Sequence, residues 1–137
     1  MKSLAFILAL TPLLFTGCAV HSPMLGFNRT VLSHEVPEHY SPHTNLVFIT
    51  KKSLPPSVKC DNLCQIDVGK VWWGNTEWVL RDMANRAREV GADALIEVNT
   101  WHQPAGWSWA APHGVGKAVK IPEKAAIDFS TIEGVWR

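Results

Sequence analysis

Cys60 and Cys64 are separated by three residues, and this C-x₃-C spacing allows two different chemistries. In an oxidising compartment such thiols tend to pair, and a disulfide closing so short a loop would contribute about 2 kcal/mol in the chain-entropy model. As thiolates they could instead bind zinc or copper together with His102 or His113, since sulfur and imidazole suit both metals. The spacing is not the usual C-x₂-C of zinc sites, and no second cluster accompanies it. We therefore expect a structural disulfide, with a metal site as the alternative.

Cys18 follows a short apolar run near the start of the chain. Lys2 precedes the run, which is shorter than the about 20 residues that span a bilayer, and this layout is typical of a secretory signal peptide. The stretch FTGC, ending at Cys18, resembles the bacterial lipobox. The resemblance implies that residues 1–17 are removed and that Cys18 carries several acyl chains, which together anchor a protein stably to a lipid bilayer. Ala19 after the cysteine is similar to the pattern of lipoproteins sent to the outer membrane, facing the periplasm or the surface. A plain signal peptide cut nearby, or an uncleaved anchor, is the alternative.

The charge balance argues against nucleic acid as a partner. The chain has 13 Lys and Arg and 12 Asp and Glu, and removal of residues 1–17 takes away Lys2 and leaves 12 of each. A neutral chain with scattered charges offers no basic stripe to neutralise phosphates. The partners that we expect are the lipid bilayer, through acylated Cys18, and an envelope protein.

The sequence contains no pattern typical of an enzyme site. The stretch GVGK lacks the longer G-x₄-G-K-[ST] frame of a phosphate-binding loop and precedes a predicted strand, not a helix. Asp61, Asp67 and Asp93 lie in unrelated segments, so pairing any two as acid and base has no basis. We expect no catalysis and no cofactor.

A segment rich in tryptophan is the densest unusual feature of the chain. It contains Trp101, Trp107 and Trp109, with His102 and His113 around them. Such rings are favoured at interfaces, so the segment is a candidate recognition loop for an envelope protein, a glycan or the lipid headgroup layer. The alternative, which we favour for the ring bodies, is that they fold back over an open sheet face with at least one edge exposed. The same core role is expected of three further residues, Trp72, Trp73 and Trp78.

The elements that must position these residues are one helix and four strands. Apolar positions at helical spacing predict a helix over residues 76–91, with Asn75 or Thr76 as the cap and Gly91 as the left-handed end. Strands are expected at 46–50, 65–73, 93–101 and 115–121. The short connections around the helix suit a parallel, right-handed βαβ unit. The predicted fold is therefore α+β, a small β-β-α-β-β domain with one helix on a mixed four-stranded sheet.

The predicted domain covers residues 46–137, after the signal peptide at 1–17 and a lipidated N-terminus and flexible tether at 18–45. The three prolines of the tether and its lack of hydrophobic period suggest this division. The tail after Pro122 has apolar residues to bury but no clear period.

The segments DVGKV, MANRAREVGADALIEV and GVGKAVKI resemble the small β-α-β-β domains of the Rcs envelope stress sensor lipoprotein and of the YbjQ-type family, which is linked to heavy-metal binding. The resemblance covers about residues 46–121. It implies the fold, and it implies a lipoprotein that works by contacting other envelope proteins without catalysis. The small residues Ala84, Ala87, Ala92 and Ala94 are expected to serve packing between helix and sheet.

Overall fold

The computed structural model describes residues 27–32, 40–105 and 108–137. The expected signal peptide and Cys18 lie outside these residues. The elements, in chain order, are β1 (Phe27–Leu32), β2 (Phe48–Ile49), β3 (Asp61–Gly69), α2 (Thr76–Glu89), β4 (Ala94–Ala105), β5 (Ser108–Lys120), the 3₁₀ helices η2 (Lys124–Ala126) and η3 (Phe129–Thr131), and β6 (Val135–Trp136).

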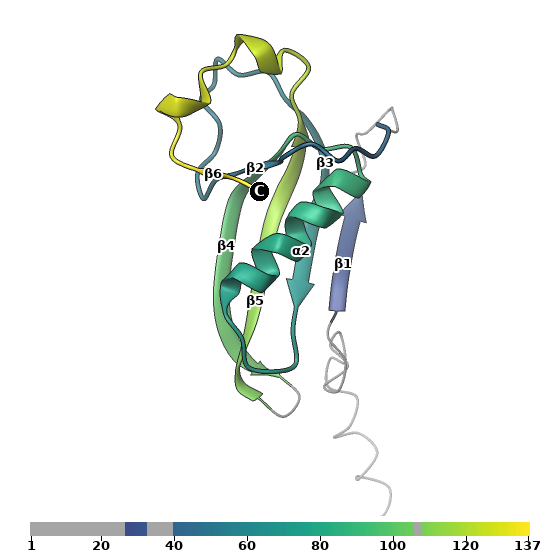
Figure 1. Cartoon of the computed structure of the whole chain (residues 1–137), viewed down its shortest axis with the longest axis vertical. Coiled ribbons are helices and arrows are strands. Elements are labelled where there is room, and N and C mark those ends of the chain that lie inside the picture. The colour runs from purple at the N-terminus through teal and green to yellow at the C-terminus, as the bar shows by residue number, and fades with distance from the viewer. Residues whose placement is uncertain (1–26, 33–39, 106–107) are drawn as a thin grey trace, which may run out of the picture.

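One sheet organises the described residues, and α2 lies across one of its faces (Figure 1). Its six strands are ordered β1-β3-β5-β4-β2-β6, with β2 and β4 parallel and every other neighbouring pair antiparallel. The predicted α+β class with one helix on a mixed sheet is confirmed. The sheet is larger than the four strands expected, because β1 and β6 extend its two edges. Residues 27–32, which form β1, fall within the segment expected to be a tether.

The strands on either side of α2 are parallel to each other, as predicted, but they are not neighbours. Both β3 and β4 pair antiparallel with β5, which lies between them. The predicted boundaries of β4 and β5 were too short, because residues expected to form the tryptophan-rich loop continue both strands as a hairpin. The described candidate recognition residues, Trp101, His102, Trp109 and His113, therefore stand on paired strands and not on a free loop.

Local sequence signals fix both ends of α2. The side chain of Asn75 accepts a hydrogen bond from the backbone N–H of Glu77 at 2.6 Å, as expected of a helix cap. At the other end Gly91 has a φ of 76°, and a Cβ there would lie 2.6 Å from Cβ of Tyr40. Glycine is needed at this turn both for the left-handed backbone and for the close approach of the chain at Tyr40.

The apolar side chains form two clusters on opposite faces of the sheet. The cluster under α2 contains Val47, Ile49, Leu63, Cys64, Ile66, Val68, Val79, Met83, Ala84, Ala87, Ala92, Leu95, Val98 and Ala118. The cluster on the other face contains Phe48, Leu54, Ala94, Ile96, Val119 and Ile121. The small residues expected to serve helix packing do so at Ala84, Ala87 and Ala92, whereas Ala94 belongs to the face away from the helix.

An irregularity in β4 explains how its residues divide between the clusters. The pairing with β5 shifts between Ile96 and Asn99, and Glu97 has a φ of 53°. A simple alternation would put Ala94, Ile96 and Val98 on one face, as the sequence suggests. The bulge instead moves Val98 to the helix side.

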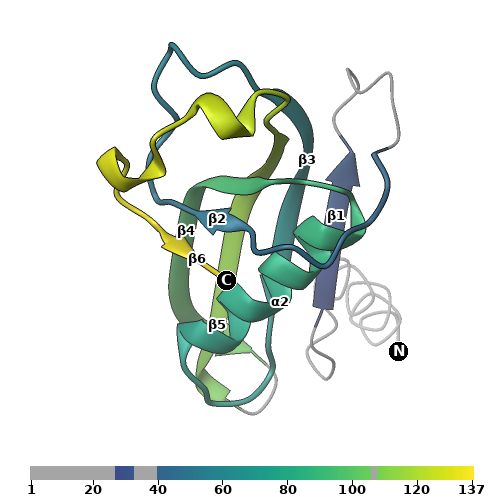
Figure 2. The same cartoon turned by 45° about the horizontal axis from the view of Figure 1, so that its top comes forward.

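The C-terminal tail covers the second face of the sheet. Ile127, Phe129 and Ile132 pack against the second cluster, together with Val58 and Cys60 from the loop before β3. Figure 2 shows the tail and this loop together over one end of the sheet, away from the β4–β5 hairpin. The tail thus completes a core through 3₁₀ turns, which explains why it has no helical or strand period.

Candidate recognition site

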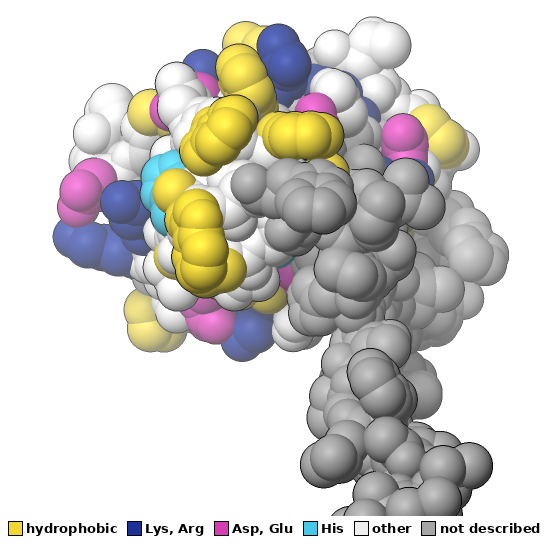
Figure 3. Space-filling model, turned by 90° about the horizontal axis from the view of Figure 1, so that it is seen from below, with side chains coloured by type: hydrophobic (Ala, Val, Ile, Leu, Met, Phe, Trp, Pro, Cys, Tyr) yellow, Lys and Arg dark blue, Asp and Glu magenta, His cyan; other side chains and the backbone are white. Residues whose placement is uncertain are grey.

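Several large aromatic side chains project into solvent at one end of the domain. This end is formed by the loop at residues 70–75, the start of α2 and the β4–β5 hairpin, and we call it the tryptophan end. Its exposed fractions are 56% for Trp72, 64% for Trp73, 49% for Trp78 and 83% for Trp109. Figure 3 looks onto the domain from this side, and hydrophobic side chains gather in the described part of the view. Contiguous exposed apolar surface of this kind marks interaction sites.

Hydrogen bonds between the loop and the hairpin hold this end together. The ring of His102 donates from Nε2 to the carbonyl of Gly74 at 3.1 Å, and the backbone N–H of Lys70 donates to the carbonyl of Pro112 at 3.1 Å. A Cβ on Gly74 would lie 2.7 Å from the ring of Trp78 and 3.5 Å from Cγ of Pro112. The absence of a side chain at Gly74 therefore lets the Trp78 ring lie against the loop.

Charged side chains are absent from the segments that carry Trp72, Trp73 and Trp109. Neither residues 71–76 nor residues 98–116 contain Asp, Glu, Lys or Arg. The charged residues that flank the loop are paired, Lys70 with Asp82 and Glu77 with Arg137. A partner that covers this end would have few unpaired charges to remove from water.

A stacked layer supports the hairpin from within. The Trp101 and His113 rings stack with centroids 5.9 Å apart and an interplanar angle of 20°. The indole N–H of Trp101 donates to Oε1 of Gln103 at 2.8 Å, and the amide of Gln103 donates to Nδ1 of His113 at 3.4 Å. His113 is 1% exposed. This layer stiffens the hairpin and keeps its outer residues in place.

The five predicted recognition residues have different positions. His102 and Trp109 reach the surface, Trp101 is half-buried and His113 is buried beneath it. Trp107 lies outside the described residues. The Trp109 ring is therefore exposed, as a recognition residue would be, whereas the Trp101 ring packs within the hairpin.

The core role expected of Trp72, Trp73 and Trp78 is wrong. Trp72 and Trp73 follow the last residue of β3 and lie 6.4 Å apart, ring centroid to centroid, outside the strand ladder. Trp78 lies on the exposed side of α2, near Arg81 and Asp82. The sequence already indicated that Trp78 is exposed. Residues three and four positions apart share a face of a helix, and the residues at these positions after Trp78 are the charged Arg81 and Asp82.

The expected disulfide between Cys60 and Cys64 is not present in the structure, and both are free thiols. Cys64 belongs to the cluster under α2, whereas Cys60 packs against the cluster on the other face. The sheet separates the two environments. Burial raises the pKa of the Cys64 thiol to about 11, and burial followed by the nearby Asp61 carboxylate raises the pKa of Cys60. Raised pKa values keep thiols protonated at neutral pH and weaken them as nucleophiles and metal ligands.

The alternative metal site is not assembled either. Its four residues were Cys60, Cys64, His102 and His113. Cys64 pairs with Ala118 of β5, whereas His113 pairs with Gly69 at the far end of β3. Across the part of the chain that the structure describes, no group of three His, Cys, Asp or Glu side chains could hold a metal ion.

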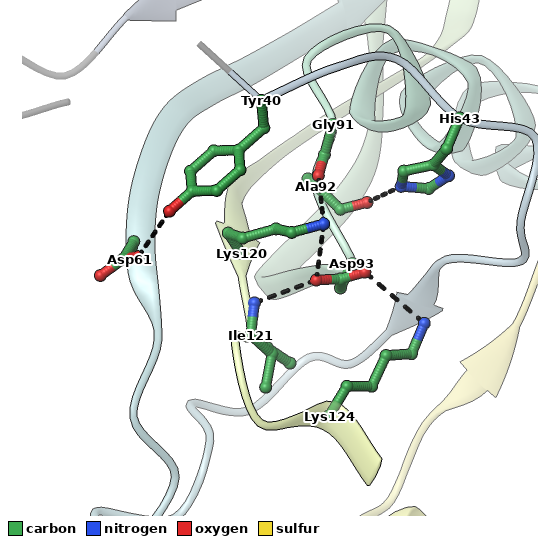
Figure 4. A network of polar contacts seen from close by, with 9 residues as sticks. All are labelled: Tyr40, His43, Asp61, Gly91, Ala92, Asp93, Lys120, Ile121 and Lys124. Atoms are coloured by element: carbon green, nitrogen blue, oxygen red, sulfur yellow. Dashed lines mark hydrogen bonds and ion pairs between the residues drawn. The ribbon is translucent and has the colours of Figure 1, made fainter. Parts of the chain in front are cut away.

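The opposite end of the sheet holds a buried acidic side chain, Asp93, in a network of polar contacts (Figure 4). Asp93 is 7% exposed and accepts a hydrogen bond from the backbone N–H of Ile121 at 3.1 Å. Nζ of Lys120 lies 3.2 Å from its carboxylate, and Nζ of Lys124 lies 3.6 Å away. Lys120 also donates to the Gly91 carbonyl at 3.2 Å. These contacts join the turn after α2 to the end of β5 and the tail, which is a structural role.

Comparison with family models, curated proteins and solved structures gives no match to this chain. The resemblance to the Rcs sensor and the YbjQ-type family stays a prediction. No described helix is long and apolar enough to cross a membrane.

Proposed function

We propose that the protein is a lipid-anchored lipoprotein of the bacterial envelope that acts by binding, as an interaction or stress-sensing module, without catalysis. Acyl chains on Cys18 would hold it at the outer membrane, and the tryptophan end would be its recognition surface. The observation that carries the proposal is the exposure of Trp72, Trp73 and Trp109 on two segments that contain no charged side chain.

The physical support is the free-energy balance of exposed aromatic rings. A tryptophan in solvent gives up the favourable burial of its large apolar surface, so a cluster of them favours a role in contact with a partner. The hydrogen bonds from His102 and Lys70 keep the loop and hairpin together before contact. A surface ordered in advance loses less entropy on binding than a flexible one.

A zinc or copper protein using Cys60 and Cys64 is less well supported. The two thiols occupy opposite clusters, and their raised pKa values oppose the thiolate form that a metal requires. We therefore keep binding at the tryptophan end as the proposed function.

Expression of the full chain in a bacterium, followed by intact mass measurement, tests the anchor. We expect a mature chain beginning at Cys18 with the added mass of its acyl chains, found in the outer-membrane fraction. Cys18→Ala should abolish both the modification and the cleavage that accompanies it. An unmodified Cys18 in the wild-type chain would contradict the proposal.

Site-specific photo-cross-linking in living cells tests the recognition surface. An aromatic photoreactive amino acid in place of Trp109 should give cross-links to envelope protein or lipid, because this side chain is 83% exposed at the tryptophan end. The matched control is Lys59, an exposed position in the loop before β3. Equal cross-linking from both positions would remove the case for a recognition surface at the tryptophan end.

A further inference from the structure

We infer that the tryptophan end binds the lipid bilayer itself, with its exposed indole rings in the headgroup layer. This inference rests on the proposed lipid anchor and specifies the partner of the proposed recognition surface. It adds an orientation, because the tryptophan end would face the membrane and the Asp93 network would face away.

The path of the chain brings the anchor to this end of the domain. β1 begins at Phe27, which pairs with Gly69, the last residue of β3. Trp72 follows Gly69 by three positions. At the other end of the ladder Leu32 pairs with Cys64. Figures 1 and 2 show that β1 runs from the side of the β4–β5 hairpin toward the C-terminal end of α2.

The connection from the anchor to the domain is short. Eight residues separate Cys18 from Phe27. Even a fully extended chain of that length reaches only roughly 30 Å. Acylation would therefore hold Phe27, which lies opposite Gly69 near the loop that carries Trp72, within roughly 30 Å of the bilayer surface. Such tethering gives a high effective concentration, so that weak contacts between individual rings and lipid become significant together.

The chemistry of the surface fits a lipid headgroup layer better than a charged protein partner. Tryptophan is enriched at membrane interfaces, where its apolar ring and its N–H group suit the boundary between hydrocarbon and water. Residues 71–76 and 98–116 carry no Asp, Glu, Lys or Arg. Contact with lipid therefore removes no charged group of these segments from water, which would cost free energy. Trp73 and Trp109, the two most exposed rings among the described residues, come one from each segment.

Quenching of tryptophan fluorescence by brominated lipids tests the inference, since bromine quenches only rings that it approaches closely. The purified, acylated full chain is reconstituted into phosphatidylcholine and phosphatidylglycerol vesicles, with or without bromine on the acyl chains near the headgroup. We expect the brominated vesicles to lower the emission. The Trp73→Ser/Trp109→Ser double variant should lose at least about half of that quenching, because these two rings are the most exposed at the end that faces lipid.

The matched control is Trp136→Phe, which removes an indole on β6. Trp136 pairs with Phe48, which pairs in turn with Ala94 beside Asp93, far from the hairpin tip. This substitution should leave the bromine-dependent loss of emission unchanged. Circular dichroism of the Trp73→Ser/Trp109→Ser variant itself checks that its loss of quenching does not come from unfolding.

The possible results separate the two proposals. An acylated chain that floats with the vesicles but shows no bromine quenching overturns the membrane-facing orientation and leaves the lipid anchor intact. Equal quenching of the wild-type and Trp73→Ser/Trp109→Ser chains also overturns it. A chain with unmodified Cys18 that does not float with the vesicles refutes the proposed anchor instead.

Discussion

Asp93 and Trp109 lie at opposite ends of the same sheet and depart from the usual pattern of burial in opposite directions. The carboxylate of Asp93 is 7% exposed, although charged groups are normally in water, and Trp109 is 83% exposed, although large apolar groups are normally inside. Each departure has its own explanation. The buried acid has a backbone N–H and two ammonium groups as partners within the chain, whereas the exposed indole has no comparable enclosure.

The difference shows which end is held together by contacts within the chain and which end leaves its large apolar side chains exposed. Burying a carboxylate costs free energy unless it is paired and hydrogen-bonded, and the Asp93 contacts meet this condition by joining the turn after α2, β5 and the tail. Exposure of several tryptophans together adds nothing to the stability of the isolated domain. The tryptophan end therefore has a composition suited to a surface covered by something outside the chain.

The largest loss of stability is expected from Asp93→Ala. Removal of the carboxylate leaves the Ile121 N–H without its acceptor and Lys120 without its ion pair, and we expect the free energy of unfolding to fall by about 3 kcal/mol. Asp93→Asn is the matched control, because an amide oxygen can still accept from Ile121, and its loss should be smaller. Urea unfolding followed by circular dichroism measures both. Equal, small effects of the two variants would show that the network does not hold this end together.

A pair of tryptophan substitutions compares the two ends directly. The Trp136 ring packs against Phe48 and Phe129 with centroid distances of 5.2 and 5.0 Å, so Trp136→Ala should cost about 2 kcal/mol of unfolding free energy. Trp109→Ala should change it by less than about 0.5 kcal/mol, because the ring is in solvent. The same urea experiment applies. A loss at Trp109 as large as that at Trp136 would mean that the tryptophan end is part of the core.

A pH-dependent effect is expected from the titration of Cys64. The folded state raises the pKa of this thiol from 9.0 to about 11, so between these values the folded chain holds a proton that the unfolded chain releases. The stability due to the buried neutral thiol is therefore complete below about pH 9 and decreases as the pH rises toward 11. The destabilisation caused by Cys64→Ala should accordingly shrink over this range.

The test is to measure the unfolding free energies of the wild-type and Cys64→Ala chains at pH 8, 9.5 and 10.5. Groups that titrate in the same way in both chains cancel in the difference between the two free energies. A constant difference would contradict the raised pKa. The intact mass of the chain is the necessary control, because a chain two hydrogens light would contain the Cys60–Cys64 disulfide and no titrating thiol.

The elements that were predicted well are those whose signals lie within a few residues. Asn75 and Gly91 mark the ends of α2 because capping and a left-handed turn depend on the local backbone. Ile66 and Val68 are two positions apart, so a strand puts both on one face, and this face is the core under the helix. The tail was not predicted, because η2, η3 and β6 form against the second cluster and have no period of their own.

The candidate site was predicted in part. The density of tryptophan drew attention to Trp109, which is exposed, but it could not separate Trp109 from His113, which lies four positions away on the same strand and is buried. The contribution of Trp72 and Trp73 was missed because the loop at residues 70–75 reaches the hairpin only through contacts distant in sequence, such as that between His102 and Gly74.

The sequence by itself determined the α+β class, the helix and its ends, and the presence of a strand on each side of the helix, because hydrophobic period and capping act over short distances. The strand before the helix runs over Asp61–Gly69 and not over the predicted residues 65–73. The tertiary structure decided that β5 lies between β3 and β4, that a bulge at Glu97 moves Val98 to the helix side, and that Cys60 and Cys64 belong to different clusters. It also brought Trp72, Trp73, Trp78 and Trp109 to one end. Strand order and register depend on how separate segments pair and pack, and no window of sequence contains that information.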